Sequence, residues 1–128
     1  MSYNVYRVSS AGMPRDHHAI FIETNNPAIG CGHIYQVTGN IQGGMLYEDK
    51  PTAFPPEHDP SFLGKVLIGT VEAAMHPDTF RRVCYSVSPP TKQFEGPHRL
   101  FPQEPIRRCQ EWTSETIDAL TDAGILKR

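Results

Sequence analysis

The last predicted helix of the chain begins in the stretch Arg107-Arg108-Cys109-Gln110-Glu111-Trp112-Thr113. No proline or glycine follows until Gly124, which is well placed to cap the end of the helix. At about 100° per residue, Cys109 shares one helix face with mostly apolar residues, which are Trp112, Thr113, Thr116, Ile117, Leu120 and Ala123. We therefore expect Cys109 on the inward face of the helix, in its first turn, with two arginines just before it.

This position favours a reactive thiolate. Unpaired backbone N–H groups, the positive end of the helix dipole and nearby arginines all lower the pKa of a thiol. The alternative is that Cys109 is a small buried hydrophobic residue, which is the usual environment of a free cysteine. A base elsewhere in the chain decides between the two interpretations.

Composition and charge limit the possible classes of protein. A chain of 128 residues is the size of one domain, so we expect a single domain over 1–128. The net charge of -2 argues against binding to nucleic acid or to a membrane surface. We find neither an apolar run long enough for a membrane span nor a signal peptide. Three cysteines without framework spacing (Cys31, Cys84 and Cys109) indicate a reducing compartment, so we expect a cytoplasmic protein. The oligomeric state stays open.

Segments rich in β-formers predict a small antiparallel meander packed against helices, an α+β domain. The predicted strands are Tyr3–Val8, His17–Glu23, Gly32–Gly39, Met45–Glu48 and Val66–Glu72. The short links between the early strands favour antiparallel pairing. A surface loop is expected over Asp49–Pro60, a short helix over His76–Cys84, and no regular element over Ser88–Gln93, where two prolines are adjacent.

A catalytic thiol needs an imidazole within hydrogen-bond reach and a third polar group that orients the imidazole. Three of the six histidines (His58, His76 and His98) lie in or beside proline-rich loops, where solvated histidines are common. The other three stand at strand starts, where a histidine is well placed to face a helix packed on the sheet: His17 and His18 open one strand, and His33 opens the next.

Strand alternation separates these candidates in part. His17 shares a face with Ala19, whose small side chain leaves room for a helix, and this favours His17 as the base. Gln36 on the next strand is the preferred orienting residue. His18 remains open as an alternative base, and His33 as an alternative third member.

The same residue types also suggest a zinc site built from His17, His18, Cys31 and His33. Adjacent strand residues point to opposite faces, however, and the Cys-x-His pair lacks the usual two-residue gap. A dinucleotide or phosphate loop is not indicated, because Gly30-Cys31-Gly32 lacks the further glycines and the helix pattern. We therefore expect neither a metal nor a cofactor.

The order of these elements is a histidine on an early strand, a polar residue on the next, and a cysteine at a late helix start. It resembles the circularly permuted NlpC/P60 (papain-like) group, which includes lecithin:retinol acyltransferase-like proteins. His17–Ile22 matches that group's His-Trp-Ala-Ile-Tyr-Val type of strand, and Arg108–Trp112 its cysteine-bearing helix start. The chain also looks like small fungal proteins that share the motifs at Gly32–Gly39, Pro89–Gln93 and Arg108–Trp112. The resemblance spans about Val5 to Leu126.

The resemblance implies a permuted papain-like fold with Cys109 as nucleophile, His17 as base and Gln36 as third member. Acyltransferase-like members usually have histidine at the third position; glutamine can fix the imidazole tautomer but supplies no charge. We expect a thiol-dependent hydrolase or acyltransferase that acts through a Cys109 acyl-enzyme on an amide, ester or thioester of a small-molecule or peptide-like substrate. The alternatives are a non-catalytic binding or interaction module that retains the fold, and a structural metal-binding protein.

Overall fold

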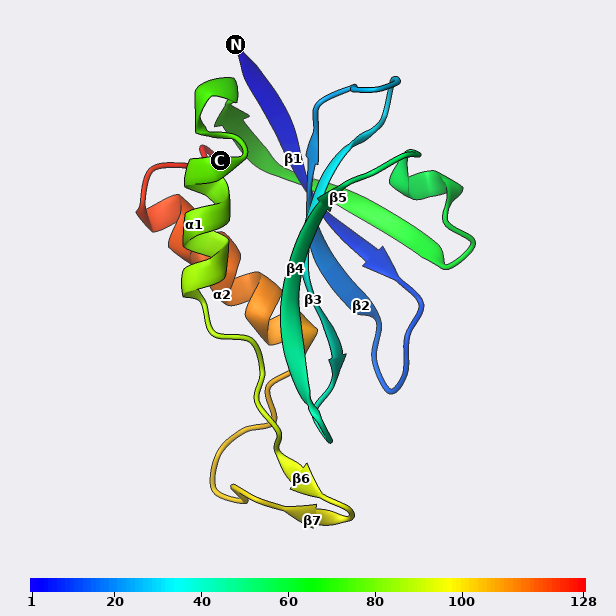
Figure 1. Cartoon of the computed structure of the whole chain (residues 1–128), viewed down its shortest axis with the longest axis vertical. Helices are drawn as coiled ribbons and strands as arrows, with labels where there is room; N and C mark the ends of the chain where they lie inside the picture. The colour runs from blue at the N-terminus through cyan, green and yellow to red at the C-terminus, as the bar shows by residue number, and fades with distance from the viewer.

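Five strands form one antiparallel sheet in the computed structural model, which describes all residues 1–128 (Figure 1). They are β1 (Ser2–Ser10), β2 (His17–Glu23), β3 (Gly32–Asn40), β4 (Gly44–Pro51) and β5 (Phe62–Glu72). Their spatial order is β4-β3-β2-β1-β5, so the first four strands form a meander and β5 returns to pair with β1. The predicted α+β class with an antiparallel sheet is confirmed.

Two helices, α1 (Asp78–Ser86) and α2 (Cys109–Asp122), pack against one face of the sheet (Figure 1). The sheet contributes Ile20 and Ile22 from β2 and Tyr35 and Val37 from β3 to the shared core, all fully buried. The helices add Phe80, Cys84, Cys109, Trp112, Ile117 and Leu120. Burial of this apolar surface is the main force that holds the layers together.

Helix α2 buries the face that its sequence predicts. Its buried residues are Cys109, Trp112, Thr113, Thr116, Ile117 and Leu120. Gly124 adopts a φ of 74° and ends the helix, as predicted. The N–H groups of Gly124 and Ile125 donate to the carbonyls of Thr121 and Leu120, both at 3.0 Å, which is a Schellman motif. Ala123 was wrongly predicted to face inward; it is exposed because the helix ends at Asp122.

Several element boundaries differ from the predictions. Strand β4 continues to Pro51, so Asp49 and Lys50 lie in a strand where a loop was expected, and helix α1 begins at Asp78. The described structure also has two short 3₁₀ turns, η1 (Pro56–His58) and η2 (Ala73–Met75). Within the proline-rich connection, β6 (Phe94–Glu95) and β7 (His98–Arg99) form a small hairpin that projects from the sheet and helices (Figure 1). Strands of two residues are too short to produce an alternation in the sequence.

The helices cover the face opposite to the one that was expected. His17 and Ala19 were predicted to face a helix, but the helices pack on the face of Ile20 and Ile22, whose side chains are larger and more apolar. Ala19 is nevertheless only 1% exposed. The chain between β4 and β5 covers its face of the sheet, with Pro56 and Phe62 nearby.

The motif at Gly32–Gly39 has a steric reason to begin with glycine. A Cβ at Gly32 would stand 1.8 Å from the carbonyl oxygen of Ile22, so the paired strands could not approach so closely with any other residue.

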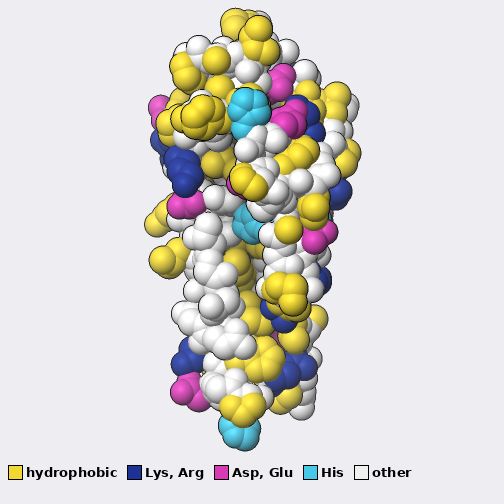
Figure 2. All heavy atoms as spheres, turned by 90° about the vertical axis from the view of Figure 1, so that its right-hand side faces the viewer, with side chains coloured by type: hydrophobic (Ala, Val, Ile, Leu, Met, Phe, Trp, Pro, Cys, Tyr) yellow, Lys and Arg dark blue, Asp and Glu magenta, His cyan; other side chains and the backbone are white.

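The molecule contains no helix that is both long enough and apolar enough to cross a membrane. Figure 2 shows one face of the molecule, on which basic and acidic side chains are interspersed among hydrophobic ones. Neither sign of charge gathers into a separate patch on this face.

A buried carboxylate, Asp49, joins helix α1 to the sheet. Its side chain is 5% exposed and accepts hydrogen bonds from Tyr47 Oη at 2.7 Å and from Arg81 Nε at 2.9 Å and Nη2 at 2.8 Å. His33 Nε2 lies 2.8 Å from Asp49 Oδ1. Burial alone would raise the pKa of Asp49, but Arg81, Tyr47 and His33 together lower it to about 2. We call Asp49 and these three partners the Asp49 network.

Replacing Asp49 by alanine should destabilise the fold, since it leaves the other members of the network without their acceptor. We expect Asp49→Ala to reduce the free energy of unfolding by about 2–3 kcal/mol in urea denaturation. Because the folded pKa lies below the unfolded value of 3.8, the wild-type stabilisation should be complete above that pH and be lost as the pH falls towards about 2.

Asp78→Ala is the matched control, because Asp78 pairs with the same Arg81 at 3.6 Å but is 89% exposed. It should cost less than about 1 kcal/mol. Equal losses in both variants would contradict a structural role for the buried network.

Candidate functional site

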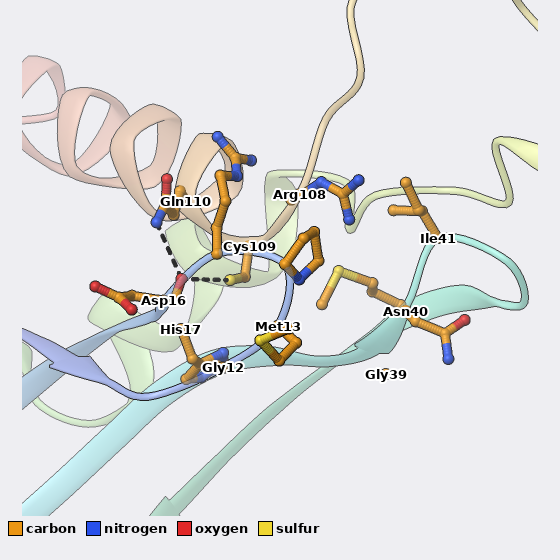
Figure 3. A pocket seen from close by; sticks show the side chains of 13 residues that line it. Gly12, Met13, Asp16, His17, Gly39, Asn40, Ile41, Arg108, Cys109 and Gln110 are labelled. Atoms are coloured by element: carbon orange, nitrogen blue, oxygen red, sulfur yellow. Dashed lines mark hydrogen bonds between the residues drawn. The ribbon is translucent and has the colours of Figure 1, made fainter. Parts of the chain in front are cut away.

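A cavity of about 210 Å³ opens where helix α2 begins (Figure 3). Three segments that are distant in the sequence line it. They are the loop from Gly12 to His17, the turn from Gly39 to Met45 between β3 and β4, and the stretch Arg108–Gln110. We call it the Cys109 cavity, because Cys109 stands in its wall.

Side chains from the first turn of α2 fix the helix start against the beginning of β2. Gln110 Nε2 donates to the carbonyl oxygen of Asp16 at 3.0 Å, and Cys109 Sγ lies 4.0 Å from the same oxygen (Figure 3). Glu111 Oε1 accepts from Arg15 Nη2 at 2.6 Å and from the Arg108 backbone N–H at 2.7 Å. Cys109 is therefore held next to the residue that precedes His17.

His17 lies at the end of β2, where the strand pairs with Ser10 of β1 but no longer with β3. The pairing of β2 with β3 runs from Glu23 back to Ile20 only, so the first residues of β2 stand free of β3 at the end of the sheet. There His17 lines the same cavity as Cys109. The structure thus brings these two predicted residues together even though α2 packs on the opposite face of the sheet.

The pKa values of the two groups are shifted towards each other. The neighbouring Cys109 side chain is the main cause that raises the pKa of His17, and its effect outweighs the opposing effect of burial. Burial alone would raise the pKa of Cys109, but the neighbouring His17 ring, the His18 backbone and the charge of Arg15 together lower it. Both shifts favour a thiolate paired with an imidazolium.

Gln36, the predicted orienting residue, contacts His17. Its Oε1 is 2.8 Å from His17 Nε2, and its Nε2 donates to Glu48 Oε1 at 2.7 Å. Because the amide nitrogen faces the carboxylate, the amide oxygen must accept the proton on His17 Nε2. The other ring nitrogen, Nδ1, is then left for the thiol. Glu48 stands directly opposite Gln36 in the β3–β4 register and adds to the raised pKa of His17.

The alternative residues lie elsewhere. His33 belongs to the Asp49 network. The ring of His18 lies on the helix side of the sheet beside Arg7 and Ile117, and burial and the Arg7 charge lower its pKa. Cys31 is buried, with its Sγ 3.5 Å from the Ala53 carbonyl oxygen. The four residues considered for zinc are therefore not gathered, and no cluster of three or more His, Cys, Asp or Glu side chains could hold a metal ion.

The two arginines before Cys109 have different positions from those expected. Arg107 Nη2 binds Glu115 Oε1 at 2.8 Å and the Ser88 carbonyl at 2.6 Å, so its charge is neutralised on the helix surface. Arg108 lines the Cys109 cavity. The charge of Arg15, with that of His17, lowers the pKa of Cys109. No pattern in the sequence marked Arg15, because it lies in an irregular loop.

The motif at Pro89–Gln93 positions the start of α2. The Gln93 side chain accepts from the Arg107 backbone N–H at 2.8 Å and donates to the Arg107 carbonyl at 2.7 Å. The Gln93 backbone N–H donates to the Ile41 carbonyl at 2.7 Å, and the Met45 N–H donates to the Pro90 carbonyl at 2.8 Å. One short segment thus ties the β3–β4 turn to the chain just before Cys109.

Comparison with known proteins places this architecture in a family. No curated protein and no solved structure matches the chain. A family model matches residues 5–127, which is nearly the whole chain and includes every residue of the site. The chain therefore belongs to the family described as "Family of unknown function (DUF6540)".

Proposed function

We propose that the protein is a thiol-dependent acyl hydrolase or acyltransferase of permuted papain-like (NlpC/P60) type, with Cys109 as nucleophile and His17 as base. The observation that carries the proposal is that Cys109, at a helix start, and His17, in contact with Gln36, line one cavity. The lowered pKa of the thiol and the raised pKa of the imidazole support it. Perturbed titratable groups that face a cavity are typical of catalytic sites.

The chemistry follows from the arrangement of the two groups. His17 takes the proton of the Cys109 thiol, and the sulfur forms a bond with the carbonyl carbon of an amide, ester or thioester. The bond from that carbon to the leaving group breaks, and the imidazolium returns its proton to the departing amine, alcohol or thiol. Water or an amine then loses a proton to His17 and attacks the thioester, which releases the product and restores the thiol.

The start of α2 also supplies donors for the oxyanion. The backbone N–H groups of Cys109 and Gln110 belong to the first turn of the helix and have no partner within the chain. Donors of this kind stabilise the negative charge that develops on the carbonyl oxygen in the transition state. In the proposed mechanism these two groups hold that oxygen.

Glu48 compensates for glutamine at the third position. Gln36 itself has no charge, but its amide links the imidazole of His17 to the carboxylate of Glu48. The negative charge of Glu48, which is hydrogen-bonded to the Gln36 amide, favours the protonated form of His17. Solvent weakens this effect, because Glu48 is 39% exposed.

Alkylation with iodoacetamide tests whether Cys109 is an activated thiolate. Because the pKa of Cys109 is lowered, its alkylation should persist to a lower pH than the alkylation of a free thiol. His17→Ala should slow this reaction by about tenfold or more, since it removes the main partner of the thiolate. The measurement is the rate of modification of each cysteine, followed by peptide mass spectrometry over a range of pH.

Cys84 is an internal control, because burial raises its pKa and it should stay unmodified. His98→Ala removes an exposed histidine and should leave the rate at Cys109 unchanged. If Cys109 reacts no faster than a free thiol, the proposal fails and a non-catalytic module is the better account.

The Gln36–Glu48 pair should act through His17. We expect Gln36→Ala to slow Cys109 alkylation at neutral pH by about tenfold and to lower the pKa of His17. Glu48→Gln keeps the hydrogen-bonding shape and should have a smaller effect, about threefold, because Glu48 is partly exposed. The pH profile of alkylation and the NMR titration of His17 report both effects.

Glu72→Gln is the matched control for loss of a carboxylate, because Glu72 pairs with β1 at the end opposite to the one that pairs with His17. A Glu48→Gln profile that coincides with those of wild type and Glu72→Gln would show that Glu48 does not contribute.

A further inference from the structure

Arg108 is a cation of the Cys109 cavity that has no acidic partner. Arg15 is bound to Glu111 at 2.6 Å, and Arg107 to Glu115 at 2.8 Å. The Arg108 guanidinium takes part in none of the ion pairs or hydrogen bonds of the chain, and its side chain lines the cavity. Its positive charge is therefore free for a ligand.

The structural contribution of Arg108 comes from its backbone alone. The Arg108 N–H donates to Glu111 at 2.7 Å, and its carbonyl accepts from the Trp112 N–H at 3.1 Å. Main-chain atoms of Arg108 make both contacts, so Arg108→Gln retains them. The fold therefore does not explain the guanidinium.

The cavity has two different sides. Figure 3 shows Asp16 and Gln110 on one side of the Cys109 sulfur, and Met13, Arg108 and Ile41 on the other. The first side is closed by the hydrogen bond from Gln110 to the Asp16 carbonyl. A substrate group on the second side would meet the apolar side chains of Met13 and Ile41 and the free charge of Arg108.

We propose that the acyl group accepted by Cys109 carries a carboxylate close to the reacting carbonyl, and that Arg108 binds this carboxylate. This substrate class rests on the proposed function of Cys109. Guanidinium groups bind carboxylates through paired, charge-assisted hydrogen bonds, so Arg108 both attracts and orients such an acyl donor. A cavity of about 210 Å³ suits a short acyl group of this kind, such as the half-amide or half-ester of a small dicarboxylic acid.

Two alkylating agents of nearly equal size test the charge preference directly. Iodoacetate carries a carboxylate next to the carbon that the sulfur attacks, and iodoacetamide carries a neutral amide there. Both reagents react with the thiolate form of Cys109, so the ratio of their two rates does not depend on the fraction of Cys109 that is ionised. We expect this ratio to exceed that of a free thiol by about tenfold at low ionic strength, and to fall as salt is added.

Arg108→Gln should remove most of this preference, with about a tenfold fall in the ratio, which does not depend on any change in the thiolate fraction. Arg108→Lys should retain part of it. Arg82→Gln is the matched control, because it removes one arginine from the exposed surface of α1 and should leave the ratio unchanged.

If the ratio of iodoacetate to iodoacetamide rates is the same in Arg108→Gln as in wild type, the inference is overturned. Any preference for the charged reagent would then come from the helix start and His17. Failure of the proposed function itself has a different signature. In that case the iodoacetamide rate at Cys109 is that of a free thiol and does not depend on His17.

Discussion

The hydrogen bond from Gln110 to the Asp16 carbonyl, with the Arg15–Glu111 ion pair beside it, fixes the start of α2 at the first residue of β2. The geometry of the site depends on this junction. It places Cys109 in the first helical turn, where the backbone N–H groups have no partner, and in the same cavity as His17, which lies beyond the β2–β3 pairing. Gln93 holds the same junction from the other side by binding both backbone groups of Arg107.

The fold separates structural polar groups from the proposed reactive ones. The Asp49 network lies on the helix side of the sheet, where every member has a partner and the carboxylate is nearly inaccessible. The His17–Gln36–Glu48 chain lies on the other side and ends at a partly exposed carboxylate. Histidines from neighbouring strands thus have different uses, because strand alternation sends His33 to one face and His17 to the other.

Much of this could be predicted from the sequence because it follows from local patterns. The strand His17–Glu23 and the buried face of α2 have clear periodicity, and Gly124 has the conformation that a helix end requires. His17, Gln36 and Cys109 could be proposed as a group from their positions on those elements. Arg15 and Glu48 could not, because their roles depend on a loop and on a strand register that no periodicity encodes. The helix-bearing face was also wrongly predicted, since a small residue such as Ala19 can equally well be covered by a loop.

The central claim is that Cys109 forms an acyl-enzyme with the help of His17. Intact mass spectrometry after brief exposure to p-nitrophenyl acetate and an acid quench tests this claim most directly. We expect one acetyl group on Cys109 in the wild-type protein, strongly reduced acetylation in His17→Ala, and none at this position in Cys109→Ser. A wild-type protein that gains no acetyl group on Cys109, or gains it at the same rate in His17→Ala, would contradict the account.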